Sequence, residues 1–464
     1  MSSTTSNQNA YLDANIGRLF AATSLPIICV MGMNGLMTVT DAILLGIYVG
    51  SDAVGAIATV FPISLLLIAG ATLIGSGMAS MLARHLGAKD LANARITFGA
   101  GNILALALAI LVIAAFMAVG KAVVLLLTNG SPILNPMAYT YIATIVFFYP
   151  VQILLSVNCD ALRCEGRAGL MALASLFVSL ANLVLNYFFI ASLELGVAGS
   201  AYGTVIAQGL ALGVVILFRI FGQIDLRFAD AWRGVLFQNM KEMIALGLPQ
   251  SLGFVGLLLV STAIMTALQW VSAQSYDVVI SAYGIITRII TCAFLPLLGI
   301  SQSMQAIVGN NVGAGLLPRA NRCFRLGVMV SMLYCLAIET MLLVYVKPIG
   351  AVFSNDPEVA DRFARIVPVM VSMHILSGPL LMIGSYFQAI GDAKRAAILG
   401  IAKPYLFTIP LIIILACLMG EKGIWLAMPI SECLLLIVSL SVLTLWAKRE
   451  KVPTVFLQTH KGGL

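Results

Sequence analysis

Charged residues are scarce in this chain. Of its 464 residues, 10% are charged and 61% are hydrophobic, and the mean hydropathy is +1.03. A water-soluble globular domain carries roughly 25% charged residues because its surface must be hydrated. This scarcity excludes a soluble fold of this size, so lipid must cover the surface. We therefore expect an all-α integral membrane protein.

Catalytic and metal-binding patterns are also missing. The chain has three histidines, and it contains no H-E-x-x-H motif, no paired aspartate motif and no G-x-x-x-x-G-K-S/T phosphate loop. Its eight cysteines form no C-x-x-C pair and are typical of small apolar packing residues. These absences argue against a membrane-embedded enzyme, an ATP-driven pump and a metal centre. No cofactor and no nucleic-acid partner are expected.

Twelve stretches are long and apolar enough to cross a bilayer, which takes roughly 20 mostly apolar residues. They run approximately over 19–48, 54–83, 97–120, 138–160, 168–192, 197–220, 244–270, 279–304, 324–346, 366–390, 396–419 and 424–446. Ten prolines lie inside these stretches. Neighbouring helices can satisfy the carbonyl that a proline leaves free in lipid. We expect bent helices at these prolines.

Basic residues are distributed unevenly between the connections. If both termini lie on the inner side, 20 of the 26 Lys and Arg residues fall on that side, including Lys403, and 5 fall on the outer side. Arg288 alone lies inside a span. Cytoplasmic loops are enriched in Lys and Arg. The pattern therefore predicts twelve spans with both termini in the cytoplasm.

Short motifs of the first half recur in the second half at a nearly constant offset, close to half the length of the chain. The pairs are Leu25-Pro26 and Leu248-Pro249, Gly87-Ala88 and Gly313-Ala314, Glu165-Gly166-Arg167 and Ile390-Gly391-Asp392, and Gly196-Val197 and Gly423-Ile424. A fixed offset is typical of a duplicated unit. Six spans per unit return the chain to the same side, so the two copies share an orientation about an axis along the membrane normal.

The duplication predicts twelve transmembrane helices in two pseudo-symmetric six-helix bundles. We expect a cytoplasmic tail, an N-lobe with spans 1 to 6, a cytoplasmic linker, a C-lobe with spans 7 to 12 and a second cytoplasmic tail, over 1–18, 19–220, 221–243, 244–446 and 447–464. Two similar bundles that face each other suit alternating access, and this architecture favours a transporter.

Asp41 is the one clearly embedded acid of the first half. It lies about seven residues from the outer end of its span, about 10 Å deep at 1.5 Å per residue. Asn182 and Asn186 are four residues apart and share a helical face, and Thr204 reaches the same depth with Gln208 on its face. Ionisable groups inside membranes are functional by default, whereas amides and hydroxyls alone also hold helices together. We expect an ion-coupling site at Asp41, Asn182, Asn186 and Thr204.

Two ions suit this cluster. Burial disfavours the charged form of a carboxylic acid, so Asp41 could bind and release a proton. The carboxylate, amide and hydroxyl oxygens could alternatively hold Na⁺. Either ion changes the charge of the site and can bias a two-state helix. Pro26, about four turns earlier in the same span, is expected to let that helix bend.

The second half has its own cluster of embedded ionisable residues: Arg288, Glu339, His374 and Glu432. All lie roughly seven to nine residues from the outer ends of their spans. One interpretation is that Arg288 forms a structural ion pair with Glu432 or Glu339. The alternatives are a second cation site or a substrate site. His374 suits packing, with a proton relay as the alternative.

Several motifs, in order and in the expected spans, resemble a known family. They are Leu25-Pro26 with Asp41 fifteen residues later, Leu162-Arg163-Cys164-Glu165-Gly166, Asn182-Leu183-Val184-Leu185-Asn186, the run from Gly196 to Thr204, Arg288 with Pro296, Gly299-Ile300-Ser301-Gln302 and Phe387-Gln388-Ala389-Ile390-Gly391. On these motifs the chain resembles multidrug and toxic compound extrusion (MATE) transporters, and is most similar to their DinF-type prokaryotic branch.

The resemblance implies a MATE-type fold in a prokaryotic inner membrane. It also implies export of amphiphilic, often cationic compounds by antiport with H⁺ or Na⁺, by a functional monomer in contact with membrane lipids. It places Asp41, Asn182, Asn186 and Thr204 in the N-lobe coupling cluster. Met37, Tyr202 and Gln208 are expected to line the cavity, as one set of side chains on spans 1 and 6.

Two departures from the family pattern matter for the coupling site. Some relatives have an acid where this chain has Asn186, and an aromatic residue where it has Met37. One carboxylate fewer favours H⁺ over Na⁺. The seventh span also lacks the acid of the NorM-type branch, which argues against a C-lobe coupling site of that kind.

The nearest alternative function is a flippase or exporter for a lipid-linked saccharide or for one dedicated metabolite. Such a protein usually lines its cleft with several basic residues. Here Arg288 is the one basic residue clearly embedded in a predicted span, and we therefore expect multidrug export.

Overall fold

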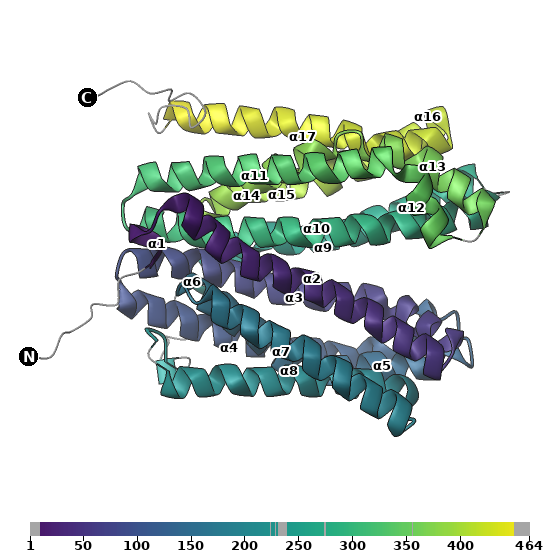
Figure 1. Ribbon diagram of the computed structural model, residues 1–464, viewed down its shortest axis with the longest axis horizontal. Helices are drawn as coiled ribbons and strands as arrows, with labels where there is room; N and C mark the ends of the chain where they lie inside the picture. The colour runs from purple at the N-terminus through teal and green to yellow at the C-terminus, as the bar shows by residue number, and fades with distance from the viewer. Residues whose placement is uncertain are drawn as a thin grey trace, which may run out of the picture.

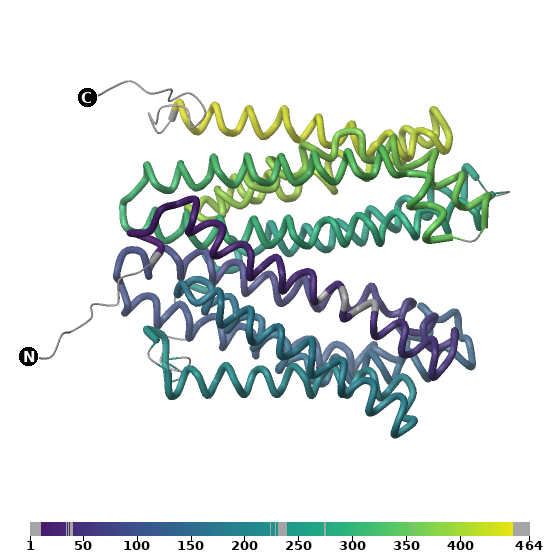
Figure 2. The backbone as a smooth tube through the Cα atoms, viewed as in Figure 1, coloured from purple at the N-terminus to yellow at the C-terminus, as the bar shows by residue number. Residues whose placement is uncertain are grey.

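Two bundles of long helices lie side by side in the computed structural model (Figure 1), which describes residues 10–222, 224–227, 229–230, 239–272, 275–354 and 356–449. Most of the two predicted tails and the middle of the predicted linker lie outside the described residues. The backbone trace shows that the N-lobe and the C-lobe each consist of consecutive helices (Figure 2). The first helix begins, and the last helix ends, at the same end of the molecule. We call this the terminal end, and the opposite one the distal end.

The N-lobe contains the first part of the chain, which begins with a short helix. Its elements are α1 (Ala10–Asp13), α2 (Ile16–Tyr48), α3 (Ser51–Gly87), α4 (Leu91–Leu127), α5 (Leu134–Phe147), α6 (Tyr149–Cys164), α7 (Ala168–Tyr187), the π-helical η1 (Phe188–Ser192) and α8 (Gly196–Phe221).

The C-lobe follows with the same order of long helices. Its elements are α9 (Met240–Val271), α10 (Tyr276–Gly313), α11 (Leu317–Val344), α12 (Val346–Phe353), α13 (Pro357–Val371), α14 (His374–Ala389), α15 (Ala393–Ile401), the π-helical η4 (Ala402–Thr408), α16 (Ile409–Met419) and α17 (Glu421–Arg449).

The number of spans matches the prediction when bent helices are counted as one. Within the described ranges, ten helical segments are long and apolar enough to cross a membrane, and there are twelve if each of two bent pairs is one span. The pairs are α5 with α6, bent by 51°, and α13 with α14, bent by 46°. They are the fourth span of each lobe, so the bend is part of the repeated unit.

Left-handed backbone turns recur at the predicted repeat offset. Positive φ angles pair up between the two halves: Lys89 with Gly315, and Gly166 with Gly391. Glycine adopts this conformation without a steric penalty. The prediction that the two halves are copies is therefore confirmed at the level of individual turns.

Hydrogen bonds between the lobes gather at the terminal end. Arg84 pairs with Glu242 at 3.0 Å, and Arg163 donates to the carbonyl of Gln302 at 2.6 Å. Ser80 donates to the carbonyl of Gln388. We call these residues the terminal seal. Toward the distal end the two lobes diverge (Figure 1), so the structure is closed at the terminal end.

Two glycines let the backbones of α3 and α10 touch within this seal. A methyl group on Gly87 would lie 1.9 Å from the carbonyl oxygen of Asn310, and one on Gly313 would lie 1.9 Å from that of Arg84. The two contacts are equivalent, because Gly87 and Gly313 are the same position in the two copies of the repeat. Such close backbone approach is possible only without a side chain.

A buried ion pair anchors the segment that follows α8. The carboxylate of Glu165 pairs with Arg219 at 3.3 Å and accepts a hydrogen bond from the backbone N–H of Leu226 at 3.1 Å. The Arg219 guanidinium also donates to the Leu226 carbonyl and lies over the Phe98 ring. Burial raises the pKa of Glu165 to about 7, although the Arg219 charge opposes that shift.

We expect Gly313→Ala to loosen the terminal seal. Overpacking a tight contact costs about 1–3 kcal/mol, so the unfolding midpoint should fall and amide hydrogen exchange should rise at the terminal ends of α3 and α10. Gly284→Ala is the matched control, because a methyl group there meets nothing within 4 Å. Equal midpoints for the two variants would contradict the close contact.

The second prediction concerns pH. Between its ordinary value of 4.5 and about 7, Glu165 holds a proton in the folded state that the unfolded chain has released. This group therefore makes the free energy of unfolding fall as pH rises through that window, and adds no further change above it.

Glu165→Gln should remove this contribution. The difference in unfolding midpoint between wild type and variant, measured on purified protein, should change between pH 5 and 7 and stay constant from pH 7.5 to 8.5. Glu358→Gln, at an exposed position of α13, should show no such change. A pH-independent difference for Glu165→Gln would refute the assignment.

Candidate functional site

Asp41 lies in a hydrogen-bonded chain of polar side chains inside the N-lobe. The Asn186 amide donates to the Asp41 carboxylate at 2.5 Å and to the Asn182 oxygen at 3.2 Å. The Asn182 amide in turn donates to the Thr204 hydroxyl at 2.9 Å. The four residues that the sequence grouped by depth thus form one connected network.

The helices bring these four side chains together from three parts of the chain. Asn182 and Asn186 lie one turn apart on α7, and both are fully buried. α7 packs against α2, which carries Asp41, and against α8, which carries Thr204. Asp41 itself is only partly buried, so it lies where the network meets its surroundings.

Gly203 makes room for the network. A methyl group on Gly203 would lie 1.9 Å from the side-chain oxygen of Asn186. That oxygen is buried and has no hydrogen-bond donor among the described residues. The missing side chain therefore determines how closely α7 and α8 approach. Gly203 belongs to the motif from Gly196 to Thr204, in which nothing distinguishes it from the other glycines.

The electrostatics of the site are those of a lone acid among neutral groups. No basic side chain pairs with Asp41 in the part of the chain that the structure describes. Its partner Asn186 offers an N–H rather than a positive charge. An isolated charge at membrane depth is costly, and binding one cation or one proton neutralises it.

Tyr141 is a neighbour that the sequence did not reveal. It lies on α5, close enough to the Asp41 carboxyl to interact with its charge. It packs on a small apolar cluster with Leu45 of α2 and Ile190 of η1. Tyrosine is common in apolar segments, so no sequence signal separates Tyr141 from ordinary packing residues.

The predicted cavity-lining residues have different environments. Met37 and Gln208 are half-buried, whereas Tyr202 is 41% exposed. Tyr202 shares a stripe of α8 with the exposed residues Ile206 and Leu210. Two residues apart on a helix, Tyr202 and Thr204 point in nearly opposite directions. Tyr202 therefore lies on a different face of α8 from Thr204, and its place in the cavity stays a prediction.

In the C-lobe, the expected ion pair between Arg288 and Glu432 is wrong. Glu432 of α17 pairs with Lys403 rather than with Arg288, and it also accepts a hydrogen bond from Ser377 at 2.5 Å. The sequence placed Lys403 in an inner connection, but it lies in the π-helical η4 within the span. The positive charge of Lys403 is accommodated inside the span because its long side chain reaches an acid on another helix.

Glu339 and His374 differ in their hydrogen bonding. Glu339 accepts a hydrogen bond from the backbone N–H of Ile375 at 2.7 Å. It therefore caps α14 just after the bend from α13, where the first N–H groups of a helix lack partners. The Nε2 atom of His374 is buried and has no hydrogen-bond partner among the described residues.

Arg288 is exposed, and no side chain of the described residues pairs with it. It lies seven residues before Leu295, which contacts Gly35 of α2, and eleven before Gly299, which contacts Ile28 of α2. Residues seven and eleven apart share one helical face. Arg288 thus extends the α2-facing stripe of α10 toward the distal end, where the lobes diverge.

Each half of the chain matches the MatE family, over residues 26–188 and 252–414. The spacing of the two matches agrees with the internal repeat. The FAD transporter of Shewanella oneidensis is 23% identical over 446 residues, covering 92% of this chain and 94% of that protein. Human multidrug and toxin extrusion protein 1 is 22% identical over 312 residues, which is 65% of this chain and 53% of the human protein.

Solved structures share the fold along the whole chain. The structure of the MATE multidrug transporter DinF-BH has a TM-score of 0.85 and 26% identity, and the match covers 99% of this chain and 100% of that one. The resemblance predicted from the motifs is therefore confirmed, and so is the predicted fold class.

Proposed function

The chain belongs to the MatE family of transporters, and from this we propose that it exports amphiphilic, often cationic small molecules by antiport with H⁺. It is a multi-pass membrane protein and a transporter rather than an enzyme. The proposal includes alternating access by a functional monomer in a prokaryotic inner membrane, with both termini in the cytoplasm. No cofactor takes part, because an ion gradient supplies the energy.

The observation that carries the proposal is the environment of Asp41. Its carboxylate is met by an amide N–H of Asn186, with the further amide and hydroxyl of Asn182 and Thr204 behind. A proton neutralises such a carboxylate without any new ligand. Na⁺ requires several oxygens around it, and the Asn186 amide presents its nitrogen to Asp41. This geometry supports H⁺ as the coupling ion.

α2 offers a route from this site to the interface between the lobes. Asp41 contacts α7 inside the N-lobe, whereas Ile28 and Gly35 of the same helix contact α10 of the C-lobe. Pro26 lies within α2, and a proline removes a backbone hydrogen bond and eases bending. Protonation of Asp41 weakens its bond to Asn186, which would release the distal part of α2 and shift the balance between two conformations.

Asp41→Asn should abolish proton-driven export while the protein still folds and inserts. In proteoliposomes with an imposed proton gradient, efflux of a cationic fluorescent dye should fall to the level of empty vesicles. Asp52→Asn, an exposed acid in the first turn of α3, is the matched control and should retain transport. Efflux at the wild-type rate by Asp41→Asn would overturn the assignment.

The same vesicles identify the coupling ion. A proton gradient alone should drive export, and substrate addition should trigger proton movement. Export driven by a sodium gradient alone, with none driven by a proton gradient, would show that Na⁺ is the coupling ion instead.

Arg288 favours a second candidate function, the export of one dedicated anionic metabolite. Its exposed guanidinium carries an unpaired positive charge at membrane depth on the α2-facing stripe of α10. An uncompensated positive charge attracts anions and repels cations. A relative that aligns over 92% of this chain is a FAD transporter, and FAD carries negatively charged phosphates.

Arg288→Gln distinguishes the two candidates. If Arg288 binds an anionic group of the substrate, the affinity for flavin nucleotides should fall roughly ten- to hundredfold, from about 1.5–3 kcal/mol for a hydrogen bond to a charged group. Binding of a cationic dye should stay unchanged or improve. Lys347→Gln, another exposed basic position, should alter neither. Equal losses for both ligands would exclude this role.

A further inference from the structure

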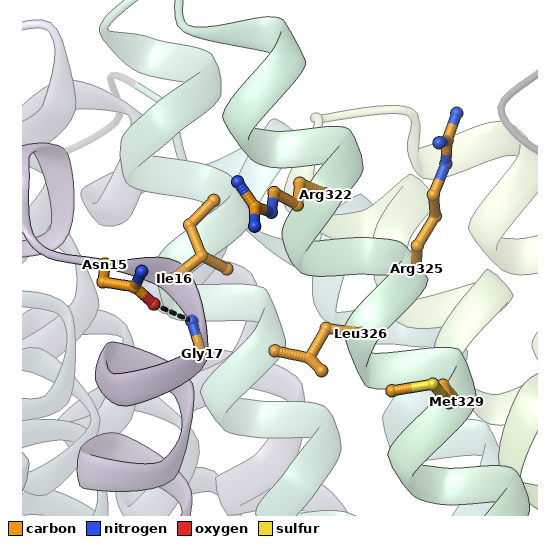
Figure 3. A pocket seen from close by; sticks show the side chains of 7 residues that line it. All are labelled: Asn15, Ile16, Gly17, Arg322, Arg325, Leu326 and Met329. Carbon is orange, nitrogen blue, oxygen red and sulfur yellow. Dashed lines mark hydrogen bonds between the residues drawn. The ribbon is translucent and has the colours of Figure 1, made fainter. Parts of the chain in front are cut away.

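A cavity of about 290 Å³ lies at the terminal end, between the start of α2 in the N-lobe and α11 in the C-lobe (Figure 3). One wall consists of Asn15, Ile16 and Gly17. The other is a single stripe of α11 with a basic upper part and an apolar lower part, formed by Arg322, Arg325, Leu326 and Met329. From this arrangement we infer a binding site for an anionic phospholipid that bridges the two lobes.

The charges around the cavity favour an anion. In residues 10–18 and 317–329, the charged side chains are four arginines and one acid: Arg18, Arg319, Arg322, Arg325 and Asp13. Asp13 is exposed and lines an adjoining cavity of about 430 Å³ together with Arg319 and Arg322. The local charge is therefore strongly positive, and a phosphate group matches the fork of an arginine side chain.

Arg322 is the residue best placed to bind the phosphate. Its guanidinium points toward Asn15 and Ile16 (Figure 3), and it is exposed with no partner among the described residues. Arg319 is already engaged, since it donates to the backbone carbonyl of Ala14 at 2.7 Å. Arg325 also lines the cavity, but its guanidinium points away from Asn15 and Ile16 (Figure 3). The site therefore depends on Arg322, and the other arginines add to the positive electrostatic potential around it.

The beginning of α2 does not supply the binding groups. The Asn15 side chain caps this helix and accepts a hydrogen bond from the N–H of Gly17 at 3.0 Å (Figure 3). The arginine side chain rather than the helix end must therefore recognise the anion. The buried side chain of Ile16 instead contributes an apolar surface.

The order of residues along α11 matches the cross-section of a bilayer. Arg322 and Met329 are seven residues apart, which is about 10 Å along a helix. The first turns of a span lie at the headgroup level, and the hydrocarbon begins below. Met329 is 49% exposed and Leu326 lies between it and the arginines. A phospholipid fits this order with its phosphate at Arg322 and an acyl chain along Leu326 and Met329, as in other basic pockets between transmembrane helices.

Lipid bound at this place would act on conformation. Ile16 packs in one apolar cluster with Cys323 and Phe324 of α11, so the cavity exists because the two lobes are closed at the terminal end. A ligand that binds one conformation alone stabilises that conformation. An anionic phospholipid therefore strengthens the terminal seal.

The test uses the purified full-length chain in a non-ionic detergent. Dioctanoyl phosphatidylglycerol should raise the unfolding midpoint by at least about 3 °C and should reduce amide hydrogen exchange over residues 80–87 in the terminal seal. Dioctanoyl phosphatidylcholine, which has the same chains and phosphate but no net charge, should do neither. Inorganic phosphate at the same concentration should also have no effect, because it lacks the acyl chains.

Two variants assign the effect to the cavity. Arg322→Gln should lose the response to phosphatidylglycerol, and Arg322→Lys should retain part of it. Lys394→Gln removes an exposed positive charge at the start of α15 and should respond like wild type. An equal response to both lipids, an equal response to inorganic phosphate, or an undiminished response in Arg322→Gln would each overturn the inference.

Discussion

A polar group that faces lipid must find its partner within the protein, because lipid offers none. This constraint explains why the chain is built from long helices, whose backbone groups bond to one another. It also explains the internal polar contacts. Asp41 lies against the amide of Asn186, Glu432 lies against Lys403 and Ser377, and Glu339 caps the second half of a bent span. Each contact supplies a hydrogen-bond or charge partner that water would otherwise provide.

The two halves of the duplicated fold satisfy this constraint with different partners for their buried acids. The N-lobe leaves its acid with neutral partners, so that no positive charge among the described residues balances Asp41. The C-lobe compensates Glu432 with the positive charge of Lys403. The backbone symmetry, visible in turns such as Gly166 and Gly391, thus carries two chemically distinct polar sites.

Close backbone contacts join the two lobes near the terminal end. Gly87 and Gly313 allow α3 and α10 to touch at the terminal end, and the Glu165–Arg219 pair holds the following segment nearby. Lipid does not drive helices together as water does, so helices in membranes associate through close packing. Small residues permit that packing. Close packing and buried polar contacts at one end leave the distal ends free to diverge.

Apolar length and motif spacing are local properties, so the membrane environment, the number of spans and the repeat could all be predicted without a structure. Asp41, Asn182, Asn186 and Thr204 could be grouped in the same way, since depth along a helix follows from residue counting. The identity of the contacting side chains, by contrast, came from the folded arrangement. Lys403 reaches Glu432, Gly203 accommodates Asn186, and Glu165 binds Arg219. The partners of each pair belong to separate segments of the chain, and their contacts depend on how separate helices rotate and pack, which residue counting along one helix does not specify.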